Sequence, residues 1–132
     1  MMKHQHNQLR LLLADDDSQV RAAIAELLQA EGFEIIEAES GLAALEIVRR
    51  QTLSCCVMDV DMPGMSGIEV LKIVQTQFGG LPSLLISGND SRERQIAAME
   101  AGAFSLLAKP VVPDLLRFSI KRMLDHHFGA GF

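Results

Sequence analysis

Short apolar runs alternate with longer amphipathic segments along the chain. The apolar runs predict strands of a sheet covered on both faces, and they lie at 9–14, 33–38, 53–58, 84–86 and 104–108. The intervening segments carry apolar residues at helical spacing and predict helices, at about 18–30, 41–50, 68–78, 92–101 and 113–128. Acidic residues flank the second run, so we expect it at an edge of the sheet.

The predicted helices differ in how much apolar surface they offer. In the second helix, Leu42, Leu45 and Val48 are expected to face inward. The fourth helix offers only Ile96, Met99 and several alanines, which predicts weak anchoring.

Strands and helices alternate five times with short connections. Such alternation requires right-handed crossovers and a parallel sheet with helices on both faces. The predicted fold class is therefore α/β, a doubly wound (βα)5 unit. If the strand order is 2-1-3-4-5, the first and third strands lie side by side, and ligands bind beyond their carboxyl ends.

Four of the five predicted strands end in a residue that carries chemistry: Asp15 with Asp16, then Asp59, Ser87 and Lys109. Taken singly, each is an ordinary helix cap or turn residue. Together they place three carboxylates at one edge, where like charges raise one another's pKa. A hard divalent cation such as Mg²⁺ removes that conflict. A cation, an ammonium group, a hydroxyl and a free carboxylate suit a phosphoryl group.

Composition narrows the class of protein. The chain has 132 residues, a net charge of −5 and no basic stripe, so nucleic acid is not expected as a direct partner. No apolar run reaches the length of a membrane span, and the first ten residues lack the apolar centre of a secretory signal. Adjacent Cys55 and Cys56 point to opposite sheet faces and are expected as core thiols. This cysteine usage fits a cytoplasmic location.

Histidines near the two ends, at His4, His6, His126 and His127, are expected to be solvated rather than metal-bound.

The residues at the strand ends resemble the receiver domain of two-component response regulators. The resemblance covers 9–128 and rests on four motifs in the family's order and spacing: Leu-Leu-Leu-Ala-Asp15-Asp16-Asp17, Met58-Asp59-Val-Asp-Met-Pro63-Gly-Met-Ser-Gly67, Ile86-Ser87-Gly88, and Ala101-Gly102-Ala103 leading to Lys109-Pro110. It implies a flavodoxin-like fold with strand order 2-1-3-4-5, and a bacterial, cytoplasmic phosphorelay protein.

The resemblance implies a role for each site residue. Asp59 is the expected phosphoacceptor, taking a phosphoryl group from a sensor histidine kinase or a histidine phosphotransfer protein. Ser87 is expected to hydrogen-bond the phosphoryl oxygens and Lys109 to neutralise them. The Lys109–Pro110 bond is expected to be cis. The domain would catalyse only its own phosphoryl transfer and slow autodephosphorylation.

The resemblance also implies a metal site for Mg²⁺, with Mn²⁺ as an alternative. Asp16 and Asp59 are expected to ligate the metal directly, and Asp15 mainly through water. The backbone carbonyl of Asp61 would add a further ligand.

One position departs from the family pattern: Leu106 stands where the family usually carries Tyr or Phe, so the aromatic part of the conformational switch is missing. Phe118 is expected to be exposed, either as an isolated aromatic or as a contact on the face of the fourth helix, fifth strand and fifth helix. The resemblance implies that this face serves a homodimer or an output partner.

For the chain ends, we expect a disordered segment at 1–8 and a frayed terminus at 129–132. The sequence ends soon after the last predicted helix, which leaves open a stand-alone receiver or a fragment of a longer regulator.

The same residues suggest three rival functions. Asp59-Val-Asp61 resembles the nucleophile loop of haloacid-dehalogenase-type phosphatases, but it follows the third strand rather than the first. A nucleotide-binding function lacks a glycine-rich phosphate loop after the first strand. A receiver-like docking domain that is never phosphorylated remains the alternative.

Overall fold

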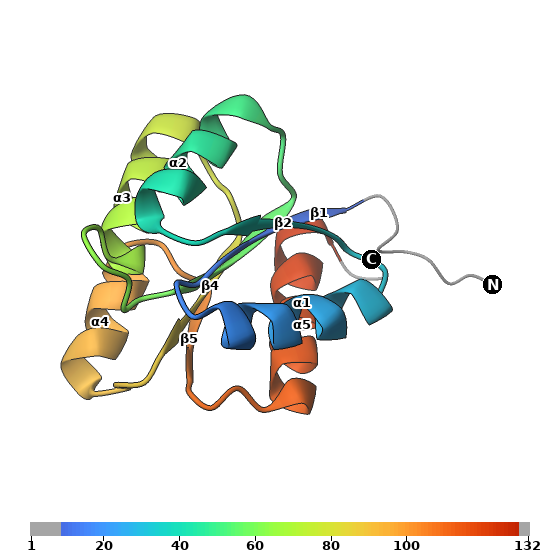
Figure 1. Ribbon diagram of the computed structural model, residues 1–132. Helices are drawn as coiled ribbons and strands as arrows, with labels where there is room; N and C mark the ends of the chain where they lie inside the picture. The colour runs from blue at the N-terminus through green and yellow to red at the C-terminus, as the bar shows by residue number, and fades with distance from the viewer. Residues whose placement is uncertain (1–8, 130–132) are drawn as a thin grey trace.

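The computed structural model describes residues 9–129 and forms one parallel sheet with helices on both faces (Figure 1). The five strands have the order β2-β1-β3-β4-β5, which confirms the predicted fold and places β2 at an edge. The strands are β1 (Arg10–Ala14), β2 (Glu34–Ala38), β3 (Cys55–Asp59), β4 (Ser83–Ser87) and β5 (Ser105–Ala108). The helices are α1 (Ser18–Ala30), α2 (Gly41–Arg50), α3 (Gly67–Phe78), α4 (Arg92–Glu100) and α5 (Pro113–Phe128).

The expectations for 1–8, for 130–132 and for His4 and His6 lie outside the described residues. None of the helices within 9–129 combines the length and the apolar character needed to cross a bilayer.

Two apolar cores, one on each face, hold the helices to the sheet. Helices α1 and α5 cover one face, and α2, α3 and α4 cover the other (Figure 1). Strands β1, β3 and β4 contribute side chains to both cores alternately, so Leu11 and Leu13 face α1 and α5 while Leu12 faces the opposite side. Each fully buried leucine stabilises the fold by about 1.5–3 kcal/mol. Because both faces are apolar, polar residues collect at the strand ends.

The register of the sheet aligns the carboxyl ends of three neighbouring strands. Ala14 of β1 pairs with Met58 of β3, and Asp59 pairs with Ile86 of β4. Asp15, Asp59 and Ser87 therefore leave the sheet at nearly the same level. The register brings together residues far apart in the sequence without any disulfide or linker.

Local capping starts the helices soon after the strand ends. The Asp17 side chain accepts hydrogen bonds from the backbone N–H groups of Gln19 and Val20 and so caps α1. Ser66 and Glu69 form a capping box at the start of α3. These caps satisfy N–H groups that the first helical turn leaves unpaired. They also fix the direction in which each loop leaves the end of its strand.

Two predicted inward faces are wrong in part. In α2, Leu45 is buried and Val48 packs against the core, but Leu42 is 69% exposed because Ala44 takes the inward position of the first turn. In α4, Ile96 and Met99 are exposed and only Ala98 is buried. The prediction that α4 is weakly anchored is therefore confirmed, and its buried face is even smaller than expected.

Both cysteines behave as core residues, as predicted. Cys55 and Cys56 are buried free thiols in opposite cores. Burial raises the pKa of Cys56 to about 12 and raises that of Cys55 further, so both stay protonated at neutral pH.

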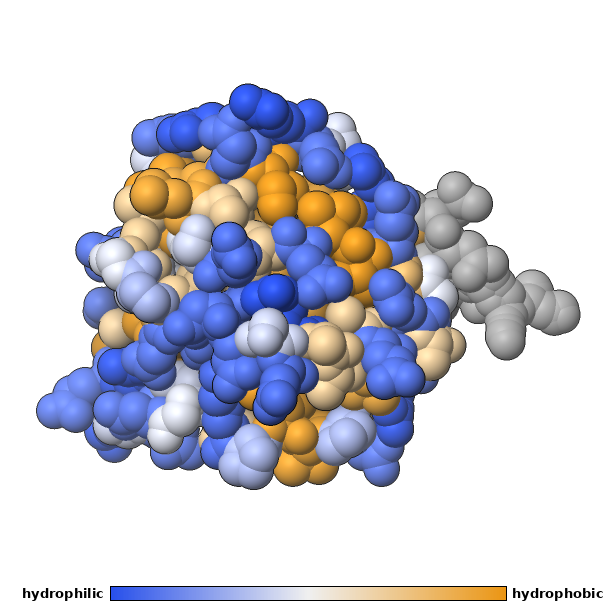
Figure 2. Space-filling view, in the orientation of Figure 1, coloured by the Kyte–Doolittle hydropathy of each residue, from blue (hydrophilic) through white to orange (hydrophobic). Residues whose placement is uncertain are grey.

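The exposed apolar side chains are dispersed. On the face drawn in Figure 2, apolar surface appears in the region of α2 and again at the lower edge, with polar side chains between. Phe118 is 59% exposed, as expected, and lines a hollow with Leu28, Glu31 and Phe33 near the end of α1. Phe118 therefore lies beside α1, and the apolar residues exposed on α4 are Ile96 and Met99.

A close backbone contact ties α3 to the end of β3. The Gly67 N–H donates to the carbonyl of Val60, and a Cβ at Gly67 would overlap the backbone carbonyl of Asp59. Only glycine permits this approach, which sets where the Asp59 loop turns.

We predict that Gly67→Ala destabilises the domain by about 1–3 kcal/mol, because an atom added in a packed contact forces the backbone apart. Gly88→Ala is the matched control, since a Cβ there meets nothing within 4 Å. Urea unfolding should show a lower midpoint for Gly67→Ala alone; equal midpoints for the two variants would contradict the packing role of Gly67.

Candidate functional site

The site is built on three carboxylates at the carboxyl end of the sheet. Asp15 and Asp59 are buried and Asp16 is exposed. One oxygen from each lies within 4.8 Å of the others, as predicted from the strand ends. The Asp15 Oδ1 atom also accepts from the backbone N–H of Asp17, which orients its second oxygen toward the site. Hard oxygen ligands at this spacing, with Asp16 open to water, fit a small divalent cation.

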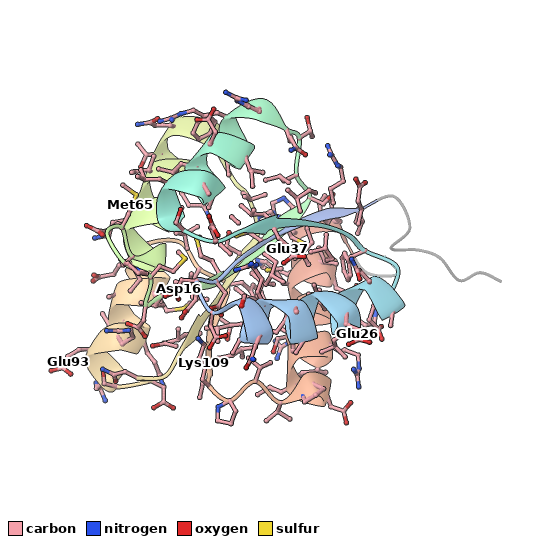
Figure 3. All side chains as sticks on the ribbon, viewed as in Figure 1. Asp16, Glu26, Glu37, Met65, Glu93 and Lys109 are labelled. Carbon is pink, nitrogen blue, oxygen red and sulfur yellow. The ribbon has the colours of Figure 1, made fainter. Side chains whose placement is uncertain are left out.

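Lys109 reaches the cluster from the loop after β5 (Figure 3). Its ammonium donates to Asp59 Oδ2 at 3.0 Å and lies 3.4 Å from Asp15 Oδ2. The Lys109–Pro110 peptide bond is cis, as expected. Burial of the ammonium lowers the Lys109 pKa, but the hydrogen bond and charges of Asp59 and Asp15 outweigh that effect and raise it. Lys109 is therefore a fixed cation inside the site.

Burial, hydrogen bonds and neighbouring charges shift the pKa of the Asp59 carboxyl in opposite directions. Its side chain is 2% exposed, and burial raises the pKa of its carboxyl. The hydrogen bonds from Lys109 and from the backbone N–H of Asp61 lower that pKa, while the charge of Asp15 raises it. The net pKa is raised. The folded state therefore holds this carboxylate at a cost that a further cation would relieve.

A second polar cluster lies beside the carboxylates and joins Ser87, Asp61 and Arg94. Arg94 donates from Nη1 to Asp61 Oδ1 at 2.7 Å and to Ser87 Oγ at 3.0 Å. The hydrogen bond from Arg94 is the main cause of the lowered pKa of Asp61. The sequence predicted Ser87 and the Asp61 carbonyl for the site but not Arg94, because no local pattern marks which helical arginine points inward.

Arg21 is a second residue that the sequence did not reveal. Its Nη1 donates to the backbone carbonyl of Asp15 at 2.6 Å, and its Nε donates to Glu37 Oε1 at 2.8 Å. Arg21 thus braces the loop after β1 against β2. The one feature of the sequence that could have indicated this role is the position of Arg21, one turn into the helix that follows Asp15-Asp16.

Leu106 and Phe104 occupy different faces of the sheet. Leu106 packs against the core beneath α2, α3 and α4, whereas Phe104 packs against the core of α1 and α5. The Phe104 ring also lies 5.7 Å from that of His126. Phe104 therefore does not substitute for the aromatic residue that Leu106 replaces.

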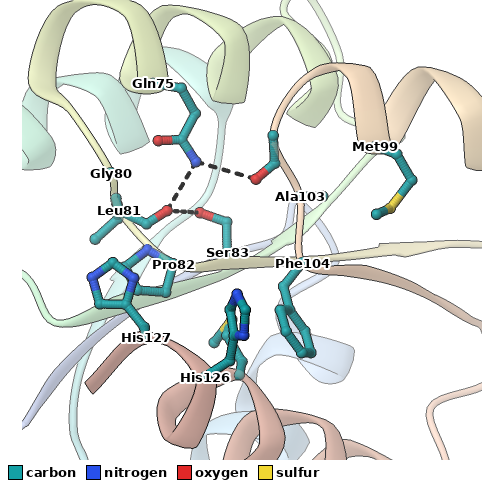
Figure 4. Close-up of a pocket in the computed structure, with 12 residues that line it drawn as sticks. Gln75, Gly80, Leu81, Pro82, Ser83, Met99, Ala103, Phe104, His126 and His127 are labelled. Atoms are coloured by element: carbon teal, nitrogen blue, oxygen red, sulfur yellow. Dashed lines mark hydrogen bonds between the residues drawn. The ribbon is translucent and has the colours of Figure 1, made fainter. Parts of the chain in front are cut away.

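A separate hollow lies at the opposite, amino-terminal end of β4 and β5 (Figure 4). It has a volume of about 460 Å³, and Phe104, His126 and His127 line part of it. Gln75 donates to the carbonyls of Leu81 and Gly102 across its rim. The Gln75 amide and the two carbonyls are thus hydrogen-bonded to one another, and the clustered carboxylates lie at the other end of the sheet. We therefore place the candidate site at the carboxylates.

The comparisons with known proteins match the chain over nearly its whole length. Residues 11–121 match the family model described as response regulator receiver domain. The response regulator protein FleR of Pseudomonas aeruginosa is 36% identical over 88% of this chain. The response regulator MprA of Mycobacterium leprae is 34% identical over the same share. The chain spans 23% of the first relative's length and 51% of the second's.

Solved structures agree with the fold. A CheY-like response regulator receiver domain protein from Methanospirillum hungatei superposes with a TM-score of 0.87 at 28% identity, covering 93% of this chain and 98% of that one. The chemotaxis response regulator CheY4 of Vibrio cholerae gives a TM-score of 0.82 at 30% identity, covering 88% and 98% respectively.

The raised pKa of Asp59 predicts the pH dependence of stability in metal-free protein. Above that pKa the folded state disfavours the ionised carboxyl, so Asp59→Asn should be more stable than the wild type, by about 1 kcal/mol or a few degrees in Tm. As pH falls past the ordinary carboxyl value of 3.8, the wild type is protonated in both states and the difference should vanish.

Asp61→Asn is the control, because the pKa of Asp61 is lowered. Its ionised form contributes stability above the ordinary value, so this variant should be slightly less stable at neutral pH. Thermal unfolding between pH 3 and 8 in EDTA measures both. An Asp59→Asn variant that is less stable than the wild type at pH 7 would contradict the charge balance described here.

Proposed function

Since the chain belongs to the response regulator receiver domain family of two-component signal transduction, we propose that it accepts a phosphoryl group on Asp59. The observation that carries the proposal is the buried Asp59 carboxylate at the end of the central strand, between Lys109 and two further carboxylates. The domain is a signalling domain, and self-catalysed phosphoryl transfer with slow autodephosphorylation is part of the proposal.

In the proposed step, a carboxylate oxygen of Asp59 attacks the phosphorus of a phosphohistidine. The new O–P bond forms as the P–N bond breaks. The imidazole ring of the phosphohistidine, protonated on its other nitrogen, takes the electron pair of the P–N bond and leaves as neutral imidazole. The product is an acyl phosphate on Asp59. Because the carboxylate is fixed by the backbone N–H of Asp61 and by Lys109, little reorientation is needed before attack.

Asp15, Asp16, Asp59 and the backbone carbonyl of Asp61 are the proposed holders of Mg²⁺ or Mn²⁺. The mutual approach of the three side chains supports this assignment. When bound, the metal supplies positive charge for the phosphoryl oxygens and relieves repulsion among the carboxylates.

Lys109 and Ser87 are proposed to bind the phosphoryl oxygens. Lys109 already carries its charge at the Asp59 oxygen, so it neutralises charge that develops there. The Ser87 hydroxyl lies at the end of the neighbouring strand and can turn toward the same space once its present partners release it.

The proposed phosphodonor is a sensor histidine kinase or a histidine phosphotransfer protein. For output, the α4–β5–α5 face is proposed to contact either a second copy or an output partner, and Ile96 and Met99 are the large apolar residues that α4 exposes there. The alternative, docking without phosphorylation, would leave the wild type unmodified by any phosphodonor.

We predict that Asp59→Asn gains no phosphoryl group from acetyl phosphate with Mg²⁺, while the wild type gains one. The amide has no free carboxylate for the attack. Intact-mass spectrometry reads the result, with Asp90→Asn as control because Asp90 is an exposed acid after β4. One added phosphoryl group on Asp59→Asn would remove Asp59 as the nucleophile.

A second variant tests the metal ligands. Asp16→Ala should weaken Mg²⁺ binding at least tenfold, because one directly bound carboxylate is lost, while the apo protein keeps its stability since Asp16 is exposed. Titration calorimetry compares it with Asp90→Ala, which removes the same charge from another loop. Equal Mg²⁺ affinity in the two variants would rule out Asp16 as a ligand.

A further inference from the structure

Arg94 closes a triangle of polar side chains beside the proposed phosphorylation site. Its Nη1 atom contacts Asp61 Oδ1 at 2.7 Å and Ser87 Oγ at 3.0 Å, and Ser87 Oγ lies 3.3 Å from Asp61 Oδ2. Asp61 belongs to the loop after β3, Ser87 ends β4, and Arg94 lies in the first turn of α4. A single guanidinium therefore connects the two loops of the site to the start of α4.

This triangle occupies the hydrogen-bonding capacity of the Ser87 hydroxyl. The oxygen accepts from Arg94 and from the backbone N–H of Asn89 at 3.0 Å. Its one proton goes to the carbonyl of Asn89, at 2.9 Å, or to Asp61 Oδ2. A hydroxyl offers one donor and two acceptor positions, so each is already used. Ser87 can donate to a new partner only by giving up a present one.

The attachment of α4 to the rest of the domain makes this link consequential. Ala98 is the one buried residue of the helix, so apolar packing holds α4 weakly. The Arg94 side chain is 25% exposed, and its contacts join α4 to the site by a charge-assisted hydrogen bond. Leu106 has no polar group to make such a connection.

We propose that Arg94 is a positioning residue that holds Ser87 and the start of α4 in the unphosphorylated arrangement. The proposal rests on the proposed phosphorylation of Asp59. A phosphoryl group there competes for the Ser87 proton and draws the hydroxyl out of the triangle. Arg94 then loses one of its two partners, and the first turn of α4 is released. Phosphorylation of Asp59 thus changes the attachment of α4 through Ser87 and Arg94, without an aromatic residue at position 106.

The test compares Arg94→Gln with Arg92→Gln. Arg92 is exposed at the first position of the same helix. Arg92→Gln therefore removes the same charge from the same helix end as Arg94→Gln, with the same effect on the helix dipole, but leaves the three side chains of the triangle in place. In metal-free, unphosphorylated protein, amide hydrogen exchange over 89–98 should be several-fold faster in Arg94→Gln and unchanged in Arg92→Gln. Arg94→Lys keeps a cation for Asp61 and should restore part of the protection.

The second measurement is the apparent affinity for beryllofluoride with Mg²⁺, which imitates the phosphoryl group. Because Arg94 holds Ser87 away from that group, Arg94→Gln should bind beryllofluoride roughly threefold to tenfold more tightly than the wild type or Arg92→Gln. Unchanged exchange over 89–98 would overturn the proposal. Weaker beryllofluoride binding in Arg94→Gln would also overturn it, since Arg94 would then bind the phosphoryl mimic itself.

The two measurements separate the proposals. If the wild type does not bind beryllofluoride, the proposal that Asp59 is phosphorylated is wrong. Amide hydrogen exchange in the unphosphorylated protein still decides whether Arg94 restrains α4.

Discussion

The ion pair between Lys109 and the buried carboxylates of Asp59 and Asp15 is the interaction on which the site depends. Two carboxylates taken out of water side by side repel each other and lose hydration, and an unpaired charge in such a place is costly. Lys109 offsets part of this cost from 3.0 Å and 3.4 Å. The pKa of Asp59 remains raised, so the compensation is incomplete. A further positive charge at the site would therefore stabilise the two carboxylates.

That arrangement requires three strands to end at the same level. Asp15 follows β1, Asp59 ends β3 and Lys109 follows β5, and the parallel register sets their relative heights. A slip of one residue in any strand would turn its side chains to the other face. Apolar packing on both faces prevents the slip, so the stability of the two cores offsets the electrostatic cost of the charge cluster at the edge.

The sequence predicted most of the framework because its signals are local. Apolar runs and helical spacing located the strands and helices, and residues at strand ends located Asp15, Asp16, Asp59, Ser87 and Lys109. The failures concern side chains whose direction depends on distant neighbours. The spacing of Ile96 and Met99 predicted an inward face, but Ala98 is the one residue of α4 that is buried.

The arginines of the site show the same limit. Arg21 and Arg94 lie on helix surfaces in the sequence pattern, and only tertiary structure turns them toward Asp15, Asp61 and Ser87. A charge pattern along one helix cannot specify a partner on another loop.

The most direct test of the central claim maps the phosphoryl group chemically. Wild-type protein treated with acetyl phosphate and Mg²⁺ is reduced with borohydride, which converts an acyl phosphate of aspartate to homoserine, and peptides are sequenced by mass spectrometry. Homoserine should appear at position 59 and at none of the other aspartates. Homoserine at Asp15, Asp16 or Asp61, with Asp59 intact, would contradict the account.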